Sequence, residues 1–214
     1  ANTVTFKDVT IVNNVNGGRC IETRTGNIDL TLENVTLTAT NGASQPFTVG
    51  GSGNNVNVDI NNSTIDAGNN GGYGITTFNP VELNINASTI TGYAALNIKP
   101  KSSSLGSKGS VIKVVNNSTL NGVNNVPAGA SNSFSTIAIE DNNIEINVDS
   151  TSTVKATTSG NNGQCIVGFG NSVNTSIISG CNLTFAGNIV LDGGKTQIVG
   201  CSSYQGSLGN NTVK

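Results

Sequence analysis

The 214-residue sequence contains no histidine, methionine or tryptophan, and only 10% of its residues are charged. Histidine most often serves as the general base or metal ligand near neutral pH, so its absence argues against both roles. Proteins that bind nucleic acids cluster Lys and Arg to neutralise phosphates, whereas this chain has two Arg and a net charge of −2. No apolar stretch approaches the ~18 residues of a transmembrane helix. We therefore expect no metal, no cofactor, no nucleic-acid partner and no membrane span.

Small polar residues make up about half of the chain, with 35 Asn, 27 Gly, 25 Thr and 22 Ser. Large apolar side chains are scarce, since hydrophobic residues amount to 35% and aromatic residues to 4%. Regular alternation of Val, Ile, Leu and Thr together with low net charge nevertheless argues against disorder. The interior must therefore be thin enough for small aliphatic side chains to fill it.

A short segment recurs along the whole chain, which indicates a solenoid. It joins two strands of alternating polarity around a polar corner, as in residues 30–37, where Leu30, Leu32, Val35 and Leu37 point inward. Successive copies lie about 28 residues apart on average, within the range of known solenoid repeats. The copies occupy residues 4–11, 30–37, 58–65, 83–90, 113–120, 146–154, 176–183 and, in degraded form, 197–204.

A third apolar strand follows each copy after a loop rich in Gly and Asn, at residues 20–21, 47–49, 75–78, 96–98, 137–139, 165–169 and 189–191. Coils of three strands can stack by parallel pairing about 4.8 Å apart. The sequence therefore predicts an all-β fold, a single-domain right-handed parallel β-helix of about eight coils over residues 1–214. The start at Ala1 leads us to expect a segment excised from a larger surface protein.

Asparagine dominates the corner between the first two strands. Stacked Asn amides can hydrogen-bond from coil to coil, and Asn tolerates the left-handed backbone of a tight corner. This pattern resembles the right-handed parallel β-helix superfamily that includes pectate lyases and many bacterial and phage surface proteins. The resemblance covers essentially the whole chain and concerns architecture alone. The expected ladder consists of Asn34, Asn62 and Asn117 at one corner position and Asn61, Asn86 and Asn116 at the position before it.

The resemblance implies that an enzymatically active member of that superfamily carries characteristic sequence motifs. Resemblance to pectate lyases calls for clustered Asp or Glu that bind Ca²⁺ beside an Arg or Lys base. Resemblance to polygalacturonases calls for N-T-D, D-D, G-H-G and R-I-K motifs, none of which this sequence contains. Fold-level similarity does not confer activity. We therefore favour a non-catalytic extracellular module that acts as an adhesin, a stalk or a glycan-binding surface domain, with a polysaccharide lyase or glycosidase as the alternative.

The candidate ligand site lies where the loops are longest, because long loops are usually functional or disordered. The intervals after the fourth and fifth copies measure 30 and 34 residues. Lys99 and Glu140 each follow the last inward residue of a third strand, so we predict that they are neighbours on adjacent coils. One interpretation is functional, namely that the two residues belong to a saccharide-binding groove or form an acid–base pair. The simpler interpretation, which we favour, is a surface ion pair that contributes at most ~1 kcal/mol to stability. The candidate residues are Lys99, Lys101, Glu140 and Asp141.

A column of threonines is expected on the surface of the second strands: Thr10, Thr36, Thr64, Thr89, Thr119 and Thr153. It resembles the T-x-T faces of ice-binding solenoids, which makes ice binding a third candidate function. The neighbouring column, expected to contain Thr38, Thr91 and Thr184, is broken by Val12, Asp66, Asn121 and Lys155. Thr also suits a solvent-facing strand simply through its β propensity.

The four cysteines do not suggest a metal site or a disulfide framework, since no C-x-x-C spacing occurs. Cys20 and Cys165 occupy the same strand slot five coils apart, roughly 24 Å at the strand spacing, which is far beyond disulfide reach. Cys181 and Cys201 fall on adjacent coils. They either form a disulfide or stack as buried thiols, and we favour the buried thiols over the disulfide.

No amphipathic cap is evident, although the ends of a solenoid expose unpaired strand edges. Because the strand pattern begins by Val4, we expect a neighbouring domain or partner to cover the N-terminal coil. A long, repetitive and weakly charged surface also favours an extracellular or cell-surface location, with a polysaccharide or a host or cell-surface glycan as the partner.

Overall fold

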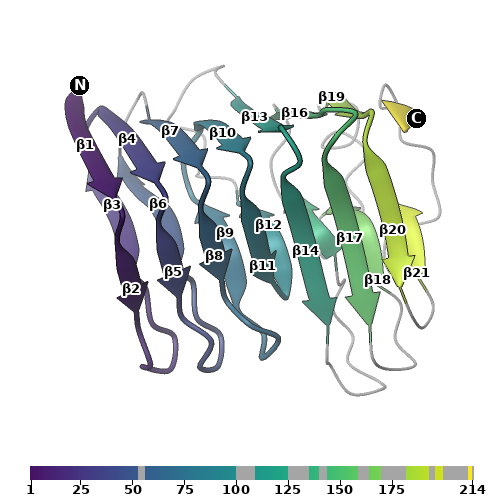
Figure 1. Cartoon of the computed structure of the whole chain (residues 1–214), viewed down its shortest axis with the longest axis horizontal. Helices are drawn as coiled ribbons and strands as arrows, with labels where there is room; N and C mark the ends of the chain where they lie inside the picture. Colours follow the sequence, from purple (N-terminus) through teal and green to yellow (C-terminus); the bar gives the residue numbers. More distant parts are fainter. Residues whose placement is uncertain are drawn as a thin grey trace.

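The computed structural model describes residues 1–52, 56–99, 109–124, 135–139, 144–158, 164–169, 182–192, 196–199 and 212–213. Over these residues it contains strands and connecting turns but no helix, and the strands form three parallel sheets (Figure 1). The predicted all-β class is therefore confirmed.

Each coil contributes one strand to each sheet, and strands that pair are one coil apart. Sheet A contains β1 (Asn2–Lys7), β4 (Ile28–Glu33), β7 (Val56–Asn61), β10 (Glu82–Asn86), β13 (Ser110–Val115), β16 (Ile144–Val148), β19 (Asn182–Phe185) and β22 (Thr212–Val213). Sheet B contains β2 (Thr10–Val12), β5 (Thr36–Thr38), β8 (Thr64–Asp66), β11 (Thr89–Gly92), β14 (Thr119–Asn124), β17 (Thr153–Thr158) and β20 (Asn188–Asp192). Sheet C contains β3 (Ile21–Thr25), β6 (Phe47–Ser52), β9 (Tyr73–Thr77), β12 (Ala94–Ile98), β15 (Ser135–Ile139), β18 (Gln164–Phe169) and β21 (Thr196–Val199).

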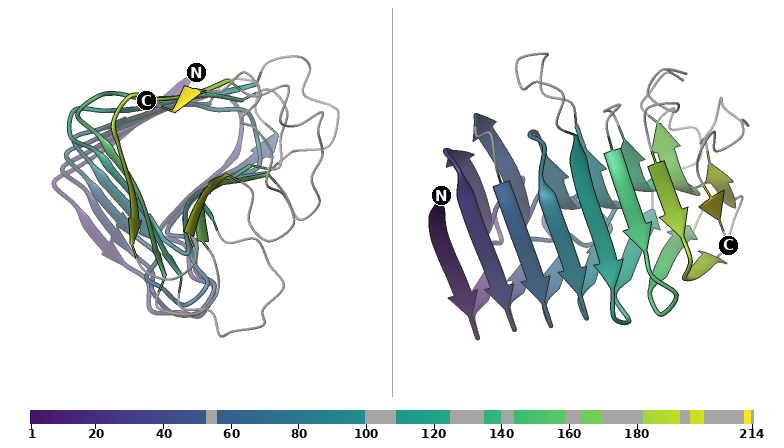
Figure 2. Two further views of the ribbon diagram at one scale, coloured as in Figure 1. Left: turned by 90° about the vertical axis from the view of Figure 1, so that its right-hand side faces the viewer. Right: turned by 90° about the horizontal axis from the view of Figure 1, so that it is seen from above.

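Viewed along its axis, the molecule has a roughly triangular cross-section with one sheet on each side (Figure 2). The chain winds in the right-handed sense that parallel crossover connections adopt. Seven coils of three strands are present in the described part, and β22 begins an eighth. The fold is thus the predicted three-stranded right-handed parallel β-helix.

Rows of aliphatic side chains stack from coil to coil and fill the interior. One row in sheet A is made of paired residues that are each at most 3% exposed: Leu30, Val58, Leu83, Ile112, Ile146 and Leu183. Inward residues become smaller where sheet B turns toward sheet C, as at Ala39, Ala67 and Ala156. Gly74 has no room for a side chain there, because a Cβ atom would lie 2.7 Å from Ile90 Cγ2. The thin cross-section explains why so few large side chains suffice.

The corner between sheets A and B places residues in the left-handed backbone region. Their φ angles are 54° at Asp8 and Asn34, 49° at Asn62, 47° at Ala87, 56° at Asn116 and 60° at Asn117. Asn and Asp adopt this region more readily than other non-glycine residues. The backbone of the corner therefore accounts for the recurrence of Asn.

The last two predicted copies of the repeat are wrong. Leu183 pairs with Ile146 in sheet A, so it belongs to the first strand of the seventh coil rather than to the end of a second strand. Residues 189–191, expected as a third strand, lie in β20 of sheet B, and residues 197–199 of the expected eighth copy lie in β21 of sheet C. The pattern misleads here because Gly187 and Asn188 replace the Ser-Thr pair that ends the corner in earlier coils.

Candidate functional site

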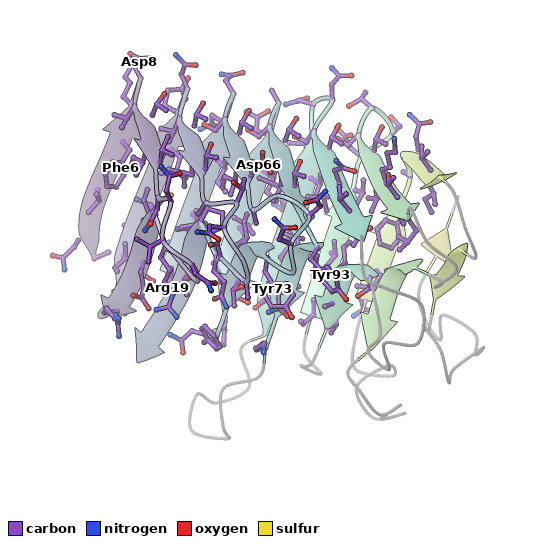
Figure 3. The ribbon with its side chains drawn as sticks, turned by 90° about the horizontal axis from the view of Figure 1, so that it is seen from below. Phe6, Asp8, Arg19, Asp66, Tyr73 and Tyr93 are labelled. Carbon is purple, nitrogen blue, oxygen red and sulfur yellow. The ribbon has the colours of Figure 1, made fainter. Side chains whose placement is uncertain are left out.

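The outer face of sheet A and the corner that follows it carry side-chain amides that hydrogen-bond between adjacent coils. In each bond an Asn Nδ2 atom donates to a carboxylate or amide oxygen of the preceding coil. The bonds join Asn34 to Asp8 (2.7 Å), Asn57 to Asp29 (2.7 Å), Asn62 to Glu33 (3.3 Å), Asn84 to Asp59 (3.4 Å), Asn86 to Asn61 (2.9 Å) and Asn116 to Asn86 (2.8 Å). Figure 3 shows Asp8 at the first-coil end of this surface. Five of the six predicted ladder residues take part, whereas Asn117 is held through its backbone N–H, which donates to Thr151 Oγ1 (2.9 Å).

A second ladder, made of serines, runs inside the same corner and was missed by the sequence analysis. Each serine Oγ accepts the N–H of a corner residue in the preceding coil. The bonds join Val35 to Ser63 (2.9 Å), Ser63 to Ser88 (2.9 Å), Ser88 to Ser118 (3.1 Å) and Ser118 to Ser152 (3.2 Å). All four serines are buried, and the only sequence signal for them is a Ser before each outward Thr. The ladder fixes the register of successive corners and hence of the surface rows beside them.

Asp149 supports the corner of the sixth coil. Its Oδ1 atom accepts the N–H of Thr151 (3.0 Å), the hydroxyl of Thr151 (2.9 Å) and the N–H of Ser152 (2.9 Å), while Oδ2 accepts the N–H of Asn116 (2.8 Å). Desolvation raises the pKa of this carboxyl, but the hydrogen bonds from Asn116, Ser152 and Thr151 outweigh it and lower the pKa from 3.8 to about 2. Asp149 is therefore a structural acid held in its ionised form.

A shallow groove of about 410 Å³ lies on the outer face of sheet A over β7, β10 and β13. Two outward rows form its polar lining. In one row Asn57 pairs with Glu82 and Glu82 with Val111, and in the other Asp59 pairs with Asn84 and Asn84 with Lys113. The lining residues are Asn57, Val58, Asp59, Glu82, Leu83, Asn84, Val111 and Lys113.

The groove combines hydrogen-bond donors and acceptors on an ordered backbone. A primary amide has two N–H donors and an accepting oxygen, so one ladder bond leaves Asn57 and Asn84 with further capacity. Two carboxylates add strong acceptors, and the Lys113 ammonium adds donors. This set matches a ligand that presents neighbouring hydroxyl groups. The sequence analysis missed the groove because it forms between rows that belong to three different coils.

Of the four predicted ligand-site residues, only Lys99 lies in the described part. It follows β12, is half-buried, and its backbone N–H donates to the carbonyl oxygen of Thr77 (2.9 Å). Ile98 pairs with Ile139, which is the register on which the expected contact between residues 99 and 140 depends. Lys101, Glu140 and Asp141 lie outside the described residues, so that contact stays a prediction.

On sheet B the structure aligns Thr10, Thr36, Thr64, Thr89, Thr119 and Thr153 in one outward row. The row beside it contains Val12, Thr38, Asp66, Thr91, Asn121, Lys155 and Val190. Thr184 was wrongly assigned to this second row, since it pairs with Asn147 in sheet A. Charged side chains thus interrupt the surface beside the threonine row.

The arginines and two of the tyrosines of the described surface make contacts with other side chains. Both arginines bind Glu22, with N–O distances of 2.6 Å from Arg19 and 2.7 Å from Arg24. The Tyr73 and Tyr93 rings make an edge-to-face contact with centroids 6.3 Å apart, and Figure 3 shows them side by side. The Cys20 thiol is free, while the side chain of Cys165 and all of Cys181 and Cys201 lie outside the described part.

Among the residues that the structure describes, no helix is long and apolar enough to cross a bilayer. The same residues hold no group of three or more Cys, Asp or Glu side chains that could coordinate a metal ion. No family model, no curated protein and no solved structure matches the chain.

Proposed function

We propose that the chain is a non-catalytic, extracellular β-helix module, an adhesin or stalk that binds a polysaccharide in the groove on sheet A. The observation that carries the proposal is the lining of this groove. It is made of amides, carboxylates and one ammonium group, with Val111 as its one outward apolar side chain. Membership of the pectate-lyase-like superfamily is part of the same proposal and rests on the repeat and the Asn corner.

The geometry of the groove favours an extended saccharide over a compact ligand. Outward rows of sheet A repeat from strand to strand about 4.8 Å apart, so a polymer along the helix axis meets polar side chains at every coil. Hydrogen bonds between coils already hold Asn57 and Asn84 in place. Binding therefore costs little side-chain ordering, which is the main benefit of a preformed site.

The first prediction tests whether the ligand binds in the groove, by replacing the lining residue Lys113. A glycan array with the full chain identifies a ligand, and calorimetric titration then measures its affinity for wild type, Lys113→Ala and Lys7→Ala. We expect Lys113→Ala to weaken binding about tenfold, because a lost hydrogen bond to a charged group costs ~1.5 kcal/mol. Lys7 is the matched control, since it is exposed on the same sheet but lies outside the groove. Equal affinities for the two variants would place the ligand elsewhere.

The enzyme alternative is supported by one feature of the same groove. Asp59 and Glu82 both line it, and most glycoside hydrolases act with a pair of carboxyl groups. An assay for newly released reducing ends separates the two functions. If the wild type turns over the polysaccharide, and Glu82→Gln abolishes turnover but not binding, a glycosidase replaces the non-catalytic proposal. Binding without turnover supports the adhesin.

A further inference from the structure

The lining of the groove on sheet A carries charges of both signs. Asp59 and Glu82 are acids and Lys113 is a cation, whereas Asn57 and Asn84 are neutral. Asn84 pairs with Asp59 on one side and with Lys113 on the other, so the two opposite charges of this row lie two strands apart, about 10 Å. This separation is comparable to the Debye length at physiological salt. A ligand that spans the groove therefore meets a negative and a positive region rather than a uniform charge.

Acidic side chains continue along the same face beyond the groove. In the row of Glu82, Asp29 pairs with Asn57 on one side, and Glu145 pairs with Val111 on the other. This row therefore carries a carboxylate on every second strand, at β4, β10 and β16, about 10 Å apart. The outward side chains of β4, β7, β10, β13 and β16, which lie side by side in Figure 1, include one cation, Lys113, and five acids: Asp29, Glu33, Asp59, Glu82 and Glu145. The face around the groove is thus negative overall.

Neighbouring amides hold two of these carboxylates in place. Asn57 Nδ2 donates to Asp29 Oδ1 (2.7 Å), and Asn84 Nδ2 donates to Asp59 Oδ1 (3.4 Å). Each bond uses one lone-pair site, whereas an ionised carboxylate has about four. The acids are therefore oriented acceptors that can take further hydrogen bonds from a ligand. A ligand hydroxyl group can donate such a bond and a ligand carboxylate cannot.

We propose that the groove selects a neutral polysaccharide and excludes polymers that carry a charge on every unit, an inference that rests on the proposed function. Neutral hydroxylated units donate to Asp59 and Glu82 and accept from Lys113, so one kind of unit satisfies the whole lining. A polymer with a carboxylate on every unit brings like charges against Glu82 and against Asp29 in the same row. A polymer with an ammonium group on every unit meets Lys113. Repulsion thus contributes to specificity as much as attraction does.

A panel of matched oligomers tests this selection with the full chain. It contains oligomers of glucose, mannose and galactose, the uronate oligomer that corresponds to each of them, and oligomers of glucosamine. In calorimetric titrations at low salt, at least one neutral oligomer should bind about tenfold or more tightly than its uronate counterpart and than the glucosamine oligomers, because juxtaposed like charges are costly. The difference should shrink at high salt, which screens the repulsion.

The panel separates two kinds of failure. If the chain binds none of the oligomers, the proposed function fails together with the selection that depends on it. If a uronate or glucosamine oligomer binds as tightly as the neutral one, the chain does bind saccharides, and only the selection of a neutral polymer is overturned.

Glu82→Gln tests whether a charge in the groove causes the preference. The substitution removes one negative charge and keeps a hydrogen-bond acceptor. It should reduce the preference for the neutral oligomer over its uronate counterpart by about fourfold, the effect of one charge about 5 Å away in water. Asp66→Asn is the matched control, because it removes the same charge from sheet B and should leave the preference as in wild type. Circular dichroism verifies that both variants are folded. An equal preference in Glu82→Gln and Asp66→Asn would overturn selection by the groove.

Discussion

Asp149 shows how one side chain compensates for an irregular corner. The sixth corner lacks the amide ladder of earlier coils, and a carboxylate that accepts four hydrogen bonds takes its place. We expect Asp149→Ala to lower the free energy of unfolding by ~1–2 kcal/mol, since it leaves several donors without an acceptor. Urea denaturation measures the change. Glu145→Ala removes an exposed acid with one hydrogen bond, to Asn147, and should stay within about 0.5 kcal/mol of wild type.

The lowered pKa of Asp149 also predicts the direction of a pH effect. Its pKa in the folded chain, about 2, lies below the ordinary value of 3.8, so ionisation favours the folded state. This contribution is complete above the unfolded pKa and is lost as the pH falls from about 4 toward 2. As the pH falls from about 4 toward 2, the free energy of unfolding of Asp149→Asn should therefore decrease less than that of the wild type. Parallel acid-dependent losses in the two proteins would contradict the assigned role.

At the scale of the elements, the serine ladder should contribute more to stability than the threonine row beside it. Ser118 Oγ accepts the N–H of Ser88, and its single hydroxyl hydrogen is shared between the carbonyl oxygens of Val115 (2.6 Å) and Ile85 (3.1 Å) inside the corner. Ser118→Ala leaves the buried N–H of Ser88 without its acceptor, which should cost ~1–3 kcal/mol. Thr119→Ala, one residue further on the outer face, should change the free energy of unfolding by less than about 0.5 kcal/mol. Similar values for both variants would mean that water replaces the lost hydroxyl.

Elements with period-two apolar patterns were predictable from the sequence, and elements defined by contacts between coils were not. Leu30, Leu32, Val35 and Leu37 point inward as expected, because alternation around a corner leaves one arrangement that buries all four. The seventh coil was misplaced because Gly187 interrupts the pattern at its corner. The serine ladder and the groove involve polar residues in a chain rich in polar residues, so only the register reveals which of them meet.

At the scale of the whole molecule, the faces formed by sheets A and B differ in chemistry. Sheet A carries amides and carboxylates around a groove, and sheet B carries a row of threonines beside a mixed row.

Hydrogen exchange of the whole chain provides the last prediction. Unpaired strand edges protect their amides poorly, so at low concentration we expect β1, β2 and β3 to exchange faster than the central strands β7, β8 and β9. The central strands are paired on both sides and serve as the internal control. Exchange in the first coil as slow as in the central strands would contradict the open edge of β1, β2 and β3.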